Sequence, residues 1–312
     1  MVTAPTVSQK RQTAWYFLLL ALASLMWSGQ GTAVKILDRH LGPIAITFLP
    51  FFVTTILFAF LLVRMRRANP NSPKLTRQDW IQFAIAGVAG QVLAQLGMTW
   101  GISKSLASNG AILNLLIPVI SAVLASLMLK ERLTPLRITA LLIGLVGVVL
   151  LSVSDFRQSS FGQMKFLIGN ILIFGGCLGS SFYNVYCKGL MQKFQEVEIL
   201  IFSYITASIA SLPLFIWVEP FHFRAFLAFD WKSWLAFAFL AFFMYGASML
   251  LFFKALQHLD VTTASASLYL VPVFGVLLAM ALLGEHLNGL AVFGAAVVLI
   301  ATLLEIKYDK VY

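Results

Sequence analysis

Ten apolar runs divide this chain, and they restrict its fold more than any other feature. They cover about 15–36, 43–63, 80–100, 105–129, 135–153, 166–187, 197–217, 232–253, 260–283 and 289–306. Each is close to the ~20 residues that a helix needs to cross ~30 Å of hydrocarbon. Only helices and closed barrels satisfy the whole backbone within lipid, and barrel strands would alternate apolar and polar residues, which these runs do not. The sequence therefore predicts an all-α integral membrane protein with ten transmembrane helices.

The charged residues indicate how the chain is oriented. They make up only 11% of the sequence, against roughly 25% in soluble domains. The net charge is +10, and fifteen of the 22 Lys and Arg residues fall in segments on the N-terminal side of the membrane. Because Lys and Arg are enriched in cytoplasmic loops, we expect a multi-pass protein of the cell inner membrane with cytoplasmic N- and C-termini. The basic balance then reflects orientation and not nucleic-acid binding.

A stretch in the middle of the chain returns close to its end. "IPVISAVLASLMLKERLTPL" (117–136) and "VPVFGVLLAMALLGEHLNGL" (271–290) agree at eight of twenty positions, with Pro118 on Pro272 and Glu131 on Glu285. Each stretch ends one apolar run and begins the next, which predicts two five-helix units, 1–155 and 156–312. Because five is odd, the second unit must enter the membrane from the opposite face. Inverted repeats are typical of secondary transporters.

These motifs resemble the EamA type of the drug/metabolite transporter superfamily. The resemblance lies in an internal Pro followed by Glu–x–Leu and a new apolar helix, "PVISAVLASLMLKERLT" and "PVFGVLLAMALLGEHLN", and in the run "ALQHLDVTTASASLYLVPVF". It covers nearly the whole chain as two copies. It implies a transporter of amino acids, other small metabolites or toxic compounds, often outward. The first copy differs from the second by Lys130, where the second copy has Gly284.

Two prolines and several end groups are candidates for moving parts. Pro118 and Pro272 fall within predicted spans, where a proline frees a carbonyl and kinks the helix, so each is either a hinge or a static kink. Glu131 and Glu285 fall at helix ends beside new helix starts such as Thr134–Pro135, which indicates an interfacial turn and leaves coupling open. Lys35 and Lys188 fall near span ends, where they either attract an anionic group or extend to the headgroups.

The centres of the predicted spans carry neutral polar and aromatic residues but no Asp, Glu, Arg or His. This weakens a carboxylate proton relay and favours a facilitator, an exchanger, or coupling through groups near the span ends. Amides and phenols can hydrogen-bond a polar solute while rings cover its apolar part, although bundles also use such groups between helices. We predict that the substrate site draws on Trp27, Gln30, Gln91, Gln95, Asn114, Tyr183, Asn184, Tyr245 and Tyr269.

Small residues predict where helices approach closely. Gly97 with Gly101, and Gly175 with Gly179, repeat at a spacing of four. Such pairs let two backbones come together in a membrane.

These features favour a secondary transporter that exports or exchanges amino acids by alternating access, as a monomer or homodimer in the lipid bilayer. Multidrug, nucleoside or sugar transport by the same fold stays open, although a basic or acidic cavity would suit most of those substrates better. A membrane-embedded lipid-modifying enzyme is a remote alternative, because the histidines are scattered over both faces and form no metal-ligand spacing. We expect no catalytic residues, metal or cofactor.

Overall fold

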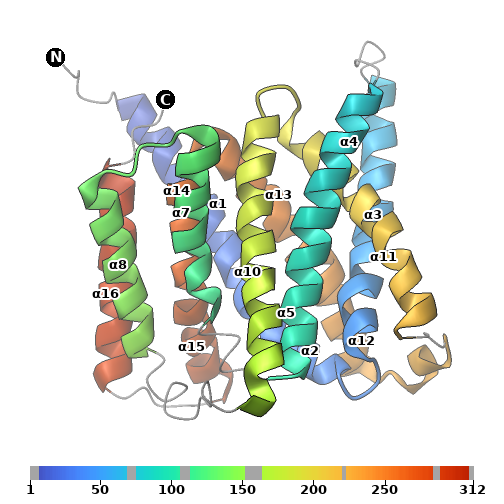
Figure 1. Cartoon of the computed structure of the whole chain (residues 1–312). Coiled ribbons are helices and arrows are strands. Elements are labelled where there is room, and N and C mark those ends of the chain that lie inside the picture. Colours follow the sequence, from blue (N-terminus) through green and yellow to red (C-terminus); the bar gives the residue numbers. More distant parts are fainter. Residues whose placement is uncertain are drawn as a thin grey trace.

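The computed structural model describes residues 7–68, 75–105, 113–151, 164–219, 223–283 and 289–308, and these residues form helices joined by turns (Figure 1). The first five-helix repeat contains α1 (Val7–Ser28) with α2 (Gln30–Leu37), α3 (Pro43–Ala68), α4 (Arg77–Ile85) with η1 (Ala86–Val92) and α5 (Leu93–Ser103), α7 (Leu116–Leu129), and α8 (Pro135–Leu151). The second contains α10 (Met164–Leu190), α11 (Glu196–Trp217), α12 (Trp231–Ala238) with η3 (Phe239–Ala247) and α13 (Ser248–His258), α14 (Val261–Ala266) with η4 (Ser267–Tyr269) and α15 (Leu270–Leu283), and α16 (Gly289–Tyr308). A short 3₁₀ turn, η2 (Phe223–Ala228), precedes α12.

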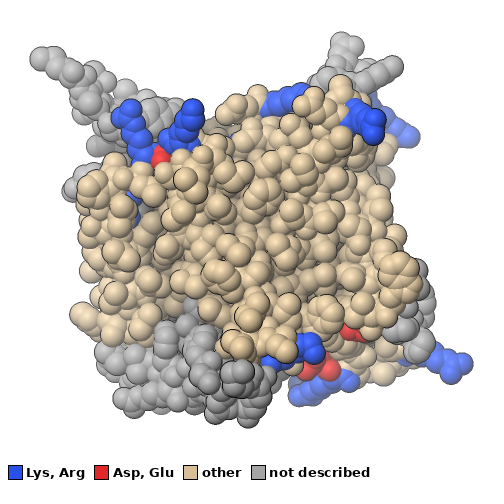
Figure 2. Space-filling model, viewed as in Figure 1, with Lys and Arg blue, Asp and Glu red and all other residues tan. Residues whose placement is uncertain are grey.

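The length and composition of these helices confirm the predicted membrane fold. Among the described residues, six helices are long and apolar enough to span a bilayer, and four shorter apolar helices accompany them. Large apolar side chains face outward, such as Phe60 and Leu127 with 71% and 74% of their surface exposed. Lys and Arg gather at the two ends, with an uncharged band between them (Figure 2). The apolar band is the surface that lipid covers.

The two repeats are inverted and packed across each other. α8 runs from the end where α1 begins, whereas α16 runs back toward that end, and the two lie side by side (Figure 1). The first helix of each repeat packs on the other repeat: α1 lies against α13 and α15, and α10 lies against α5 and α7. Neither repeat can therefore bury its own helices without the other.

Glycines bring α10 and α5 into backbone contact. A Cβ atom on Gly97 would lie 2.6 Å from the backbone nitrogen of Gly176, and one on Gly179 would lie 2.7 Å from that of Ala94. One on Gly101 would lie 2.7 Å from the backbone nitrogen of Ile173, so the sequence prediction was right for Gly97, Gly101 and Gly179. It was wrong for Gly175, where nothing lies within 4 Å of the Cβ position. The neighbouring Gly176 makes the contact because it lies one residue further around the helix.

Several spans are irregular at related places in the two repeats. The third helix of each repeat contains a π-helical segment, η1 or η3. The fourth helix of the second repeat passes through the 3₁₀ turn η4 shortly before Pro272, which cannot donate to the carbonyl four residues earlier. The first span is interrupted at Gly29, between α1 and α2. π segments and broken helices are frequent at functional sites in membrane transporters.

Two helix starts follow local capping chemistry. α8 begins at Pro135, and the Thr134 hydroxyl accepts a hydrogen bond from the Arg137 N–H at 3.3 Å, which confirms the predicted cap. α12 begins after Asp230, whose carboxylate accepts from the backbone N–H and hydroxyl of Ser233 at 2.8 and 2.7 Å. These bonds favour the ionised carboxylate and lower the pKa of Asp230 below its ordinary value.

The contact between α5 and α10 gives the first prediction. Gly97→Ala and Gly176→Ala should each destabilise the protein by about 1–3 kcal/mol, because the added methyl group overlaps backbone that cannot move aside. Thermal unfolding in detergent measures the loss. Gly175→Ala is the matched control on the same helix and should unfold like the unmodified protein. Equal unfolding temperatures for all three variants would contradict the assigned contact.

Candidate functional site

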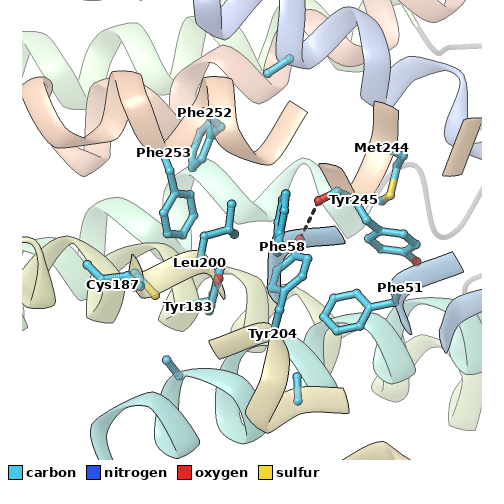
Figure 3. Close-up of a cluster of buried hydrophobic side chains, with 14 of the residues drawn as sticks. Phe51, Phe58, Tyr183, Cys187, Leu200, Tyr204, Met244, Tyr245, Phe252 and Phe253 are labelled. Atoms are coloured by element: carbon cyan, nitrogen blue, oxygen red, sulfur yellow. Dashed lines mark hydrogen bonds between the residues drawn. The ribbon is translucent and has the colours of Figure 1, made fainter. Parts of the chain in front are cut away.

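A cluster of aromatic side chains lies where the two repeats meet, and it includes several of the residues predicted to bind substrate. Phe51 from the first repeat stacks on Tyr204 with ring centroids 4.2 Å apart and meets Tyr245 edge-on at 5.4 Å. The Tyr204 hydroxyl donates to the carbonyl of Tyr245 at 3.0 Å (Figure 3). Tyr245 belongs to η3, so this bond satisfies a carbonyl of the π-helical segment.

A second group joins an amide ladder on the third helix to a buried phenol on α10. Gln95 donates to the Gln91 side chain at 3.3 Å, and Gln91 hydrogen-bonds the Tyr183 hydroxyl. The same hydroxyl lies 2.8 Å from that of Ser203 on α11. Tyr183 and Gln91 are almost completely buried, whereas Gln95 is half-buried. Gln95 is therefore the member of this ladder that a solute can reach without displacing an internal hydrogen bond of Tyr183.

Trp27 continues this group across the repeat interface. Its ring lies 5.3 Å from that of Phe252, and Phe253 lies 5.5 Å from Tyr183. Trp27 is half-buried and lies two residues before Gly29, where the first span is interrupted. Gln30 begins α2 immediately after it and is also half-buried, and Asn184 is buried beside Tyr183 in the sequence.

The structure places two predicted residues in separate clusters. Asn114 accepts a hydrogen bond from the Cys177 thiol at 3.7 Å, in a cluster formed by the fourth span and α10. Tyr269 lies in the cluster of η4, α8 and α16, with its ring against Gly144. The predicted set is thus distributed over three regions, and Trp27, Gln91, Gln95, Tyr183 and Tyr245 share the largest of them.

The helix breaks near the two prolines are held by polar side chains from the opposite repeat. The Ser24 hydroxyl on α1 donates to the Ser267 carbonyl at 3.0 Å, five residues before Pro272. The Cys177 thiol on α10 donates at 3.4 Å to the carbonyl of residue 113, five residues before Pro118. The sequence analysis did not select Ser24 or Cys177. Each is a small polar residue within the first span of its repeat, and the sequence does not show which carbonyl such a residue binds until the neighbouring helix is known.

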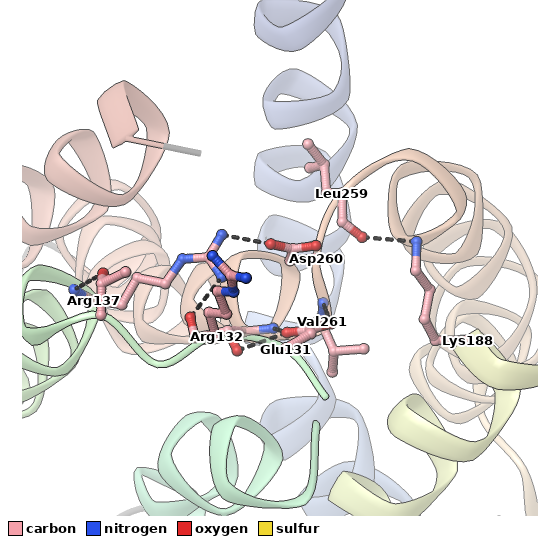
Figure 4. Close-up of polar contacts among 9 residues, drawn as sticks. Glu131, Arg132, Arg137, Lys188, Leu259, Asp260 and Val261 are labelled. Atoms are coloured by element: carbon pink, nitrogen blue, oxygen red, sulfur yellow. Dashed lines mark hydrogen bonds and ion pairs between the residues drawn. The ribbon is translucent and has the colours of Figure 1, made fainter. Parts of the chain in front are cut away.

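Lys188 lies at the end of α10 and caps another helix. Its ammonium donates to the carbonyls of Leu256, Gln257 and Leu259 at 2.7, 3.1 and 3.0 Å, where α13 ends (Figure 4). A cation is favourable there because the last carbonyls of a helix are unsatisfied and carry its negative dipole end. The side chain of Lys35, its counterpart in the prediction, lies outside the described residues.

Glu131 crosses to the second repeat instead of staying beside the start of α8. One carboxylate oxygen accepts from the Val261 N–H at 2.7 Å, and the other accepts from the N–H and hydroxyl of Thr262 at 3.2 and 2.9 Å. Arg137, at the start of α8, binds the Asp260 carboxylate at 2.5 Å. Figure 4 shows Glu131 and Arg137 on one side of this turn and Lys188 on the other. Glu285 lies outside the described residues.

The described residues contain no group of three or more His, Cys, Asp or Glu side chains that could hold a metal ion. Away from the helix ends, the polar groups described above are hydroxyls, amides, phenols and the Cys177 thiol. Such groups can bind a neutral or zwitterionic solute by hydrogen bonding and stacking.

Comparisons with known proteins agree with this architecture. The model of the EamA-like transporter family matches residues 14–153 and again residues 167–306. A solved crystal structure superposes with a TM-score of 0.76 at 18% sequence identity, covering 93% of this chain and 96% of that one. At this identity the superposition supports the fold alone.

Three relatives span almost the whole chain. An uncharacterized transporter of Archaeoglobus fulgidus is 26% identical over 93% of this chain and 98% of its own length. A probable terminal-alkyne amino-acid exporter of Streptantibioticus cattleyicolor is 22% identical, covering 89% of this chain and 88% of its own length. An S-adenosylmethionine uptake transporter of Rickettsia prowazekii is 23% identical, covering 95% and 92%.

The contacts of Lys188 give the second prediction. Lys188→Met should destabilise the protein by about 1–3 kcal/mol, because three carbonyls lose their donor at the end of α13. Lys254→Met is the matched control, since its half-exposed ammonium lies 3.6 Å from Glu196 and such pairs contribute about 0–1 kcal/mol. Thermal unfolding compares them. A Lys188→Met protein that unfolds like the control would show that the carbonyls find other partners.

Proposed function

The chain belongs to the EamA-like transporter family of membrane transporters, and on that premise we propose that it moves amino acids across the cell inner membrane by export or exchange. It is a multi-pass membrane transporter of small molecules and not an enzyme. The substrate, the membrane and the cytoplasmic position of both termini are parts of the proposal. So are the units 1–155 and 156–312, which we take as the two moving halves of a monomer or homodimer.

The observation that carries the substrate class is the neutral polar surface between the repeats. Gln95 and Trp27 are half-buried and offer an amide and an indole ring, and Gln95 bonds to the buried Gln91. An amino acid with an uncharged side chain is zwitterionic and carries one positive and one negative group, so it needs donors and acceptors but no net countercharge. The S. cattleyicolor relative, named as an amino-acid exporter, supports the same class.

The way that the repeats are packed supports the proposed alternating access. α1 lies on the second repeat and α10 on the first, so a rocking motion of one half moves a helix of the other with it. The breaks at Gly29, at η4 and beside Pro118 are the places where the helices can bend with the least loss of backbone hydrogen bonds. The hydroxyl of Ser24 and the thiol of Cys177 keep the exposed carbonyls satisfied at these breaks.

A second candidate substrate class is an amino acid joined to a nucleoside. The R. prowazekii relative is named for S-adenosylmethionine uptake and spans 95% of this chain. The rings of Trp27, Tyr183 and Tyr245 would suit a base as well as an aromatic side chain.

Counterflow in proteoliposomes tests the proposal. Vesicles loaded with unlabelled amino acids should take up labelled single amino acids saturably, with little change when a pH gradient is applied, because the described span centres hold no charged relay. Vesicles loaded with S-adenosylmethionine test the second class. Silence for all amino acids, from protein shown to be folded, would reject the proposed substrate. Strong dependence on the gradient would instead implicate carboxylates near the span ends.

Substitutions in the same assay test the proposed site. Trp27→Ala, Gln91→Ala and Tyr183→Ala should each reduce counterflow about tenfold or more, with normal membrane insertion, because each removes a group of the same cluster. Phe60→Ala is the matched control, since it removes an aromatic ring from the lipid-facing surface. Unchanged counterflow in all three variants would reject the assigned site and leave the transporter intact.

A further inference from the structure

We propose that Glu131 and Arg137 form the gate that closes the transport path at the end of the molecule where α1 begins and α16 ends. We call Glu131, Arg137, Asp260, Val261 and Thr262 the clasp. The proposal rests on the transport function inferred above. It adds the residues that decide which side of the membrane the site faces.

The start of α14 lacks a cap of its own. Asp260 occupies the N-cap position, where a carboxylate usually accepts from the first free N–H groups of the helix, but its side chain makes no capping bond. It binds Arg137 of the first repeat instead. Glu131 supplies the missing acceptor, taking three donors from Val261 and Thr262. The beginning of the ninth span is therefore completed by residues of the other repeat.

The turn before α14 is held from the other side by α10. Lys188 binds the carbonyls of Leu256, Gln257 and Leu259, and Glu131 binds the N–H groups that follow. The turn between α13 and α14 thus presents acceptors to the second repeat and donors to the first (Figure 4). Releasing the Glu131 side would free the start of α14 from the end of α7, while Lys188 on α10, which itself packs against α5 and α7, keeps its hold on the end of α13.

The backbone at the end of α7 directs Glu131 across the interface. Lys130 has a φ of 59°, in the left-handed region, and the Glu131 N–H bonds back to the Ala125 carbonyl at 3.3 Å. This turn ends the helix in a conformation that glycine adopts more readily than lysine. The second repeat has Gly284 at the corresponding sequence position.

The clasp lies where its polar groups are partly exposed. α7 packs on α14 directly beneath it, and the breaks at η4 and beside Pro118 lie deeper in the same spans. The carboxylates and Arg137 keep partial exposure, with 11% and 25% of the side-chain surface exposed at Arg137 and Asp260. Water can therefore replace these hydrogen bonds when the helices separate, whereas deeper groups would stay unsatisfied.

A similar carboxylate at the opposite end of the molecule provides the control. Glu219, after α11, accepts from the N–H groups of Ile44 and Ala45 at 3.1 and 3.0 Å and so caps α3. It joins the same two repeats with the same chemistry, far from the clasp. Substitution of Glu219 removes a helix cap without touching the clasp, so the effect of losing a cap can be distinguished from the effect of losing the gate.

Thiol labelling from each side of sealed vesicles tests the gate without any substrate. The probe is Ser121→Cys, on α7 about three turns before Glu131 of the clasp. Ser121 is fully buried and its hydroxyl has no hydrogen-bond partner in the structure, so the change is mild. The background carries Cys177→Ser and Cys187→Ala, since both native thiols are buried and would otherwise react slowly. The reagent is a membrane-impermeant methanethiosulfonate with a quaternary ammonium group.

The parent protein should label slowly from the clasp side. Glu131→Gln and Arg137→Gln should each raise that rate about tenfold, and Thr262→Val, which removes one of three donors, about two- to threefold. Glu219→Gln should leave it unchanged. An N-terminal tag shows which end of the protein faces outward in these vesicles, so the same experiment reports whether the clasp side is cytoplasmic.

Two results would overturn the gate. One is that Arg137→Gln and Glu131→Gln both label from the clasp side at the same rate as the parent protein. The other is an equal rise from both sides, or with Glu219→Gln, which would indicate general loosening. If Glu131→Gln does not insert, Arg137→Gln and Thr262→Val decide, because both retain the carboxylate. If labelling rises as expected but no amino acid gives counterflow, the proposed substrate class is rejected and the gate is upheld.

Discussion

Every backbone polar group within lipid must find a partner inside the protein, and this constraint shapes the molecule. Regular helices meet it by themselves, but several of these spans are irregular. At the irregular places a side chain of another helix supplies the missing partner. Thr54 of α3 donates to the Ala241 carbonyl in η3 at 2.7 Å, and Thr206 of α11 donates to the Phe83 carbonyl just before η1 at 2.8 Å. Each repeat thereby stabilises the breaks of the other.

The same exchange would allow so apolar a bundle to carry out the alternating access that we propose. A break satisfied by a neighbouring hydroxyl is stable, yet it bends at little cost because the bond is single and local. At the membrane surface the exchange becomes ionic, as in the contact of Glu131 with α14 or of Lys188 with α13. In the proposed motion, deep hydroxyl contacts would keep the halves together, while contacts at the surface, such as that of Glu131, could be replaced by water.

The sequence predicted some parts of the site and not others, for identifiable reasons. Gln91 and Gln95 share a helix face by their spacing, and the structure joins them. The bond from Gln91 to Tyr183 links different repeats, and no local pattern indicates it. Asn114 and Tyr269 are also polar and also fall within predicted spans, but the rotation of their helices places them in other clusters. Depth can be predicted from hydropathy, whereas the direction of a side chain depends on which helix packs beside it.

The sequence by itself determined that lipid surrounds the chain, and it determined the ten spans, the duplication and the helix start at Thr134. These features follow from hydropathy, spacing and capping, which depend on residues close together in the sequence. Only the tertiary structure decided the partners. It showed that α1 and α10 are exchanged between repeats, that Gly176 and not Gly175 meets α5, and that Glu131 caps a helix 130 residues away. Such contacts form between segments that are distant along the chain, so they follow from the packing of whole helices and not from any local pattern.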